Sequence, residues 1–114
     1  MPIAINDVAT LKQYIEAIMV RSEHHGPNVG GIALALAGAV IWRKDDAPIE
    51  VREGRSMAHG TVLWVQIGGQ RYAFRYNHTT GAIEMRLGTV RGDVLHTFSN
   101  QTPVAEVERV FRDL

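Results

Sequence analysis

Two runs rich in β-branched and aromatic residues, 61–67 and 70–76, are separated only by Gly68 and Gly69. Such a spacing is typical of a β-hairpin, because its two-residue turn needs backbone angles that glycine adopts without strain. Pairing the residues that flank the two glycines sets the register and the two faces. One face then carries Leu63, Val65, Ile67, Tyr72, Phe74 and Tyr76, and the other carries Val62, Trp64, Gln66, Arg71, Ala73 and Arg75.

Residues 82–87 alternate between apolar and polar side chains and predict the next strand. The apolar residues of both strands share a face only if the two residue numbers of each cross-strand pair add up to an odd number. This is the case when Tyr76 lies opposite Gly81. A slip by one residue would place Glu84 among the aromatic side chains. We therefore expect a connection of four or six residues, with Glu84 close to Arg75.

Three further segments show apolar residues at helical spacing or a helix start signal. They are residues 7–24 after a cap at Asn6, residues 29–42 after a cap at Asn28, and a C-terminal helix after a cap at Thr102 with Pro103 at its first position. Short strands are expected at 49–52 and 94–98. The order predicts one α+β domain over residues 1–114, with two N-terminal helices, an antiparallel meander of four to five strands and a C-terminal helix. The helices should pack mainly on one sheet face.

The composition supports a cytoplasmic protein with its own core. The chain has 114 residues, of which 46% are apolar, and it contains no cysteine and no secretory pattern at its start. The uncharged segment 29–42 is shorter than the roughly 20 apolar residues of a membrane span, so no membrane insertion is expected. Twelve basic and twelve acidic side chains cancel, which argues against a dedicated nucleic-acid binder and fits self-association.

No pattern in the chain indicates catalysis, a metal or a cofactor. The five histidines never recur as H-x-H or H-x-x-x-H, and the adjacent His24 and His25 would point in different directions on a helix. The serines stand in no nucleophile elbow, and the glycines form neither GxGxxG nor a P-loop. The sequence therefore leans towards a protein that is not an enzyme, with no cofactor.

Small residues in the apolar segment 29–42 are spaced for close helix packing. Gly31, Ala35 and Ala39 lie four residues apart and share one helical face. That face could pack against the rest of the chain or against a helix of another subunit. The two interpretations leave open whether this helix is covered by its own chain.

The second face of the hairpin places a tryptophan among arginines. Trp64 is expected between Arg71, Arg75 and Arg86, with Val62 nearby. This combination is enriched at protein interfaces and could also stack an aromatic ligand or a base. Alternatively, the arginine stems simply cover the indole on a solvated sheet face.

These patterns favour a non-enzymatic interaction module, most simply a homodimer, with a further protein partner as another option. A second hypothesis is a small-molecule binder or modest enzyme with a pocket between helices and sheet. Its polar groups would be Tyr14, Tyr72, Tyr76 and His96. A third is a nucleic-acid accessory protein that uses the arginines on one side of the sheet, namely Arg52, Arg71, Arg75, Arg86 and Arg91.

Four stretches carry a family resemblance: AGAVIWRKDDAPIEVREG, LWVQIGGQRYAFRYNHTTGAIEMR, RGDVLHTF and TPVAEVERVF. They resemble small hypothetical proteins encoded on mobile integron gene cassettes, over about residues 37–111. The resemblance implies a small bacterial α+β protein that is often an oligomer. It transfers no catalytic residue to this chain.

Overall fold

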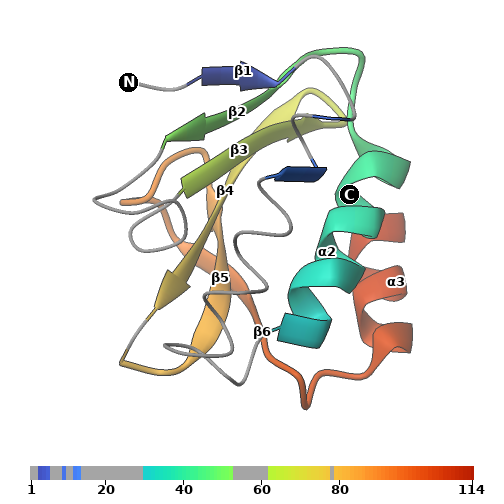
Figure 1. Ribbon diagram of the computed structural model, residues 1–114, viewed down its shortest axis with the longest axis vertical. Coiled ribbons are helices and arrows are strands. Elements are labelled where there is room, and N and C mark those ends of the chain that lie inside the picture. Colours follow the sequence, from blue (N-terminus) through green and yellow to red (C-terminus); the bar gives the residue numbers. More distant parts are fainter. Residues whose placement is uncertain (1–2, 6–8, 10–11, 14–29, 53–61, 78) are drawn as a thin grey trace.

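The computed structural model describes residues 3–5, 9, 12–13, 30–52, 62–77 and 79–114. Its elements are β1 (Ile3–Ile5), α2 (Gly30–Arg43), β2 (Ile49–Arg52), β3 (Val62–Ile67), β4 (Gln70–Asn77), β5 (Ala82–Leu87), β6 (Val94–Phe98) and α3 (Val104–Arg112). Six strands form one antiparallel sheet in chain order, and α2 and α3 lie together on one side of it (Figure 1). The α+β class and the meander from β2 to β6 are confirmed.

The β3–β4 hairpin has the predicted register, with Ile67 paired to Gln70. Gly68 and Gly69 have φ angles of 62° and 82°, so both need the conformation that glycine adopts most easily. The carboxylate of Asp45 accepts hydrogen bonds from the backbone N–H groups of both glycines, each at 2.8 Å. The turn is thereby held by the segment that follows α2.

In the β4–β5 pair the residue numbers of paired positions add up to an odd number, as predicted. Asn77 pairs with Ala82, which leaves a four-residue connection, and Tyr76 lies opposite Ile83 rather than Gly81. Because side chains alternate along a strand, a shift of two residues leaves every side chain on the sheet face where it was expected. Glu84 therefore lies opposite Arg75, on the side of the sheet away from the helices, as predicted.

The prediction of two N-terminal helices is matched only by α2. The first expected helix, at 7–24, lies almost wholly outside the described residues, as do the expected caps Asn6 and Asn28. The three described residues of that segment, 9, 12 and 13, are helical, and before it the structure contains β1, which pairs with β2. A strand of three residues is too short to show an alternating pattern, so β1 was not predicted.

The predicted cap at Thr102 is wrong. The helix α3 follows Pro103 as its N-cap, and no side chain caps its start. The Thr102 hydroxyl instead accepts a hydrogen bond from the backbone N–H of Ser99, at 3.0 Å. A threonine one position too early stabilises the preceding turn rather than the helix.

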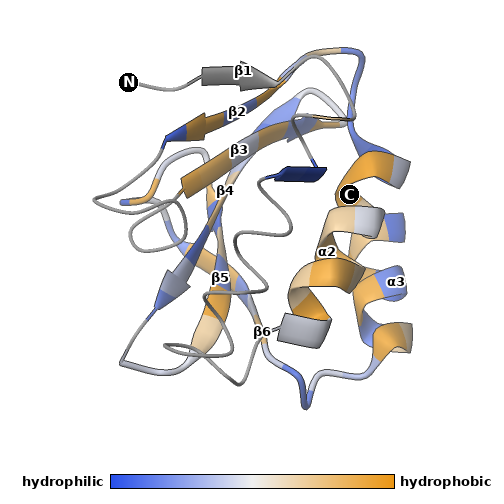
Figure 2. Ribbon diagram, viewed as in Figure 1, coloured by the Kyte–Doolittle hydropathy of each residue, from blue (hydrophilic) through white to orange (hydrophobic). Residues whose placement is uncertain are grey.

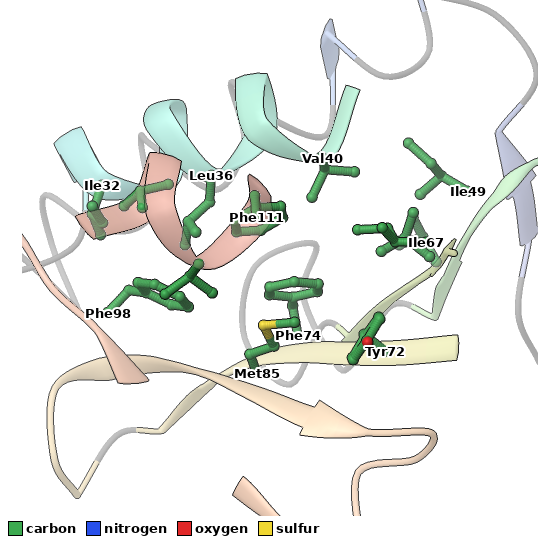
Figure 3. Packing of buried hydrophobic residues seen from close by; sticks show 14 residues of the cluster. Ile32, Leu36, Val40, Ile49, Ile67, Tyr72, Phe74, Met85, Phe98 and Phe111 are labelled. Atoms are coloured by element: carbon green, nitrogen blue, oxygen red, sulfur yellow. The ribbon is translucent and has the colours of Figure 1, made fainter. Parts of the chain in front are cut away.

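The core fills the layer between the two helices and the sheet (Figure 3). Phe111 of α3 is completely buried at its centre and stacks on Phe74 of β4, with 6.1 Å between ring centroids. Its ring also lies 6.5 Å from that of Phe98. The other core side chains are Ile32, Leu36, Val40, Ile49, Val51, Val65, Ile67, Tyr72, Met85, Val107 and Val110.

Polar contacts fix α2 at both ends. The Asn100 side chain accepts a hydrogen bond from the backbone N–H of Ile32, in the first turn of α2, at 3.0 Å. At the other end Arg43 donates from Nε to the carbonyl oxygen of Phe111, at 3.0 Å. Both contacts satisfy backbone groups that a helix end leaves without internal partners. Because α2 is anchored in this way, its outward face has a defined orientation.

Candidate interaction surfaces

One face of α2 exposes large apolar side chains. Leu34, Ile41 and Trp42 are 54%, 53% and 51% exposed, and together with Gly38 they share one side of the helix. A side chain built at Gly38 would meet nothing within 4 Å. We call these four residues the α2 stripe; Figure 2 shows how strongly apolar α2 is.

The small residues singled out in the sequence lie mainly on another face of α2. Ala35 and Ala39 are half-buried and pack against the core. Gly31 is exposed, and a Cβ built there would lie 3.4 Å from Oδ1 of Asn100. At Ala35 and Ala39 the four-residue spacing serves packing within the chain. The α2 stripe lies at positions 0, 4, 7 and 8, but in a helix that is apolar on all sides this spacing does not single out the exposed face.

Two arginines frame one end of the α2 stripe. The guanidinium groups of Arg43 and Arg112 lie 5.5 and 5.7 Å from the ring centroid of Trp42. Both distances fall within the range of cation–π attraction. Trp42 is thus oriented by the two helices while half of its surface stays accessible.

On the opposite side of the sheet Trp64 is only 8% exposed. It packs with Val62, Ala73 and the half-buried Val90 in a second, smaller apolar cluster. The guanidinium of Arg71 lies 5.1 Å from its ring centroid, as the sequence suggested. The indole is therefore largely covered and does not form an open stacking platform.

The second arginine on Trp64 is Arg52, at 5.7 Å from the ring centroid. Of the other two expected neighbours, Arg86 lies one strand further away, opposite Ala73, and hydrogen-bonds to Glu84. Arg75 lies opposite Val62, as Arg52 does, and its Nε is 3.8 Å from Glu84. Arg52 was expected on the same side of the sheet but not beside Trp64, because no short sequence pattern sets the pairing of β2 with β3.

Glu84 is a buried carboxylate on this second face, 5% exposed. Its Oε1 accepts hydrogen bonds from Nε and Nη2 of Arg86, at 3.0 and 2.9 Å. Its Oε2 accepts one from Asn77, at 2.9 Å. Burial alone would raise the pKa of Glu84. The hydrogen bonds from Asn77 and Arg86, with the positive charges of Arg86 and Arg75, outweigh burial and lower the pKa.

The candidate pocket residues do not meet at one point. Tyr72 belongs to the core, and Tyr76 packs against it. His96 lies on β6 opposite Met85, with its ring 6.1 Å from that of Phe98. Two strand spacings of about 4.8 Å therefore separate the backbone of His96 from that of β4, which carries both tyrosines. Tyr14 lies outside the described residues.

Among the described residues no three histidine or carboxylate side chains are grouped as a metal site would require. The helices in that part of the chain are also too short or too polar to cross a membrane.

The structure defines an α+β protein in which two helices cover one face of an antiparallel sheet. The chain belongs to the family described as Integron cassette protein VCH_CASS1 chain, whose model matches residues 11–108. The resemblance to integron cassette proteins is thereby confirmed, and the match begins earlier in the chain than residue 37. No curated protein matches the chain.

Proposed function

We propose that the protein is a non-enzymatic interaction module that self-associates as a homodimer through the α2 stripe. The observation that carries this proposal is the exposure of Leu34, Ile41 and Trp42, each more than half accessible on one helix face. Adjacent exposed apolar side chains of this size are typical of interaction sites. A tryptophan beside arginines is also typical of interface hot spots.

A second copy of the same chain is the partner that the α2 stripe fits best. Gly38 lies at its centre, with Leu34 four residues before it and Ile41 and Trp42 three and four residues after it. A twofold axis near Gly38 would place Leu34 of one copy against Ile41 and Trp42 of the other. The stripe is therefore self-complementary, as a twofold interface requires. It contains no charge that would repel its copy.

The size of the α2 stripe supports a weak dimer. A helix of 14 residues is roughly 21 Å long and 10 Å wide, so one face offers about 200 Å². Stable interfaces bury about 800 Å² on each partner. We therefore expect dissociation in the micromolar range, and dimers that form only as the protein is concentrated.

Sedimentation equilibrium over a wide concentration range tests the proposal. The wild type should shift from monomer to dimer mass. Leu34→Glu should stay monomeric, because a carboxylate would be buried against an apolar surface. Val104→Glu is the matched control, since Val104 is also an exposed apolar residue, 69% accessible, but lies at the start of α3. It should dimerise like the wild type.

Two results would contradict the proposal. One is a wild-type protein that stays monomeric at every concentration. The other is a Leu34→Glu variant that dimerises as well as Val104→Glu. Native mass spectrometry adds a separate readout: a monomer that retains a reproducible extra mass would support the small-molecule binder instead.

A further inference from the structure

The sheet face opposite the helices collects arginine side chains. Arg52, Arg71, Arg75 and Arg86 lie on it, together with two carboxylates, Glu50 and Glu84. We call this set of six residues the arginine face. Every cation in it is an arginine, whose planar guanidinium can bind a carboxylate or phosphate through two parallel hydrogen bonds.

The four arginines of this face outnumber its two carboxylates, so part of the positive charge has no partner within the face. Both oxygens of Glu84 are already occupied by Arg86 and Asn77. The Nε of Arg75 lies 3.8 Å from Glu84, and this buried nitrogen finds no hydrogen-bond acceptor. Glu50 forms an ion pair with Arg71, at 3.3 Å. The Glu84 carboxylate thus already accepts three hydrogen bonds from other donors, and its pairing with Arg75 is loose.

Arg52 and Arg75 flank the same residue. Val62 pairs with Arg52 of β2 on one side and with Arg75 of β4 on the other. Arg52 is exposed and forms no ion pair with another described residue; its guanidinium rests only near the ring of Trp64. The backbones of these two arginines, whose guanidinium groups are incompletely paired, therefore lie two strand spacings apart, roughly 10 Å.

We propose that the arginine face docks an acidic segment of a partner protein, held chiefly by Arg52 and Arg75. Charge complementarity is the argument for this partner, because carboxylates of an extended peptide could engage both guanidinium groups. Single-stranded nucleic acid fits less well. Trp64 is only 8% exposed and is too deeply covered to stack a base. This site lies across the sheet from the α2 stripe and does not depend on dimerisation.

Fluorescence anisotropy with a labelled deca-glutamate peptide tests the proposal. The wild type should bind at low ionic strength and more weakly at physiological salt. The double variant Arg52→Gln/Arg75→Gln should bind about fivefold more weakly in total, because each surface ion pair contributes only modestly. Arg52→Gln alone changes only an exposed side chain and covers the case in which the double variant does not fold.

The matched control is Arg109→Gln, which removes one arginine of an exposed ion pair on α3. It alters the net charge as Arg52→Gln does and should leave peptide affinity unchanged. Absence of wild-type binding, or an equal loss in Arg109→Gln, would overturn the proposal. Tighter binding of a deoxythymidine oligonucleotide of matched charge would also overturn it, because the face would then prefer phosphate. If the arginine variants keep the dimer mass of the wild type, their loss of peptide binding does not result from lost self-association.

Discussion

At the scale of single residues, Glu84 shows how a buried charge in this sheet is supplied with hydrogen-bond partners. Three hydrogen bonds, from Arg86 and Asn77, replace the water that the carboxylate loses. The register expected for β4 and β5 made the side of the sheet predictable, and with it the nearness of Arg75. The contact with Asn77 was not predictable, because it depends on how the strand end turns into the connection.

Glu84→Gln should lower the free energy of unfolding by about 2 kcal/mol, because it leaves the half-buried Arg86 without its counter-charge. Urea denaturation measures the change. Glu106→Gln is the control, since Glu106 pairs with Arg109 on the exposed surface of α3. Its effect should stay below about 0.5 kcal/mol. Equal effects of the two substitutions would show that the Glu84 cluster contributes no more than a surface pair.

The pH dependence of stability follows from the lowered pKa of Glu84. In the folded protein the pKa of Glu84 lies below its unfolded-state value, which is near 4.5. The stability that the ionised carboxylate contributes is therefore complete above about pH 4.5. It is lost as the pH falls through the folded-state pKa. The stability difference between wild type and Glu84→Gln should therefore shrink on acidification. A difference that grows as the pH falls would contradict the lowered pKa.

At the scale of elements, the predictable parts are those whose signal is local. The hairpin at Gly68 and Gly69 and the alternation of β5 are visible in short windows of sequence. The pairing of β1 with β2 and the contact of Arg52 with Trp64 are not, because they join segments separated along the chain. Likewise α2 could be predicted as a helix. Its uniform apolarity hid which face would stay exposed.

The β5–β6 connection supplies a prediction at this scale. A Cβ at Gly92 would overlap the carbonyl oxygen of Leu87, far inside contact distance. Gly92→Ala should therefore force the connection apart and lower stability by more than about 2 kcal/mol. Gly38→Ala is the matched substitution: it meets open space in α2 and should raise stability by about 1 kcal/mol. Thermal unfolding of the two variants in dilute solution checks both signs; a neutral Gly92→Ala would contradict the close contact.

At the scale of the whole molecule, the sheet separates two surfaces of different chemistry. The helix side exposes the uncharged α2 stripe, and the opposite side exposes the arginine face. The net charge of the chain does not reveal these two different surfaces, because twelve basic and twelve acidic residues cancel. Fold class and family could be anticipated from the sequence. The arginines of the sheet face could also be anticipated, but the exposed face of α2 could not, since it depends on how the helix is rotated against the sheet.

The strand order has a consequence for how the chain folds. Strands β2 to β6 are paired in chain order. Four of the five strand pairings therefore join segments that are close together in the sequence. Such local contacts cost little chain entropy and form early. The contacts of Ile32 with Asn100 and of Arg43 with Phe111 each span 68 residues. Docking of α2 therefore belongs to the late, slow part of folding, and it is the step at which the outward face of that helix is set.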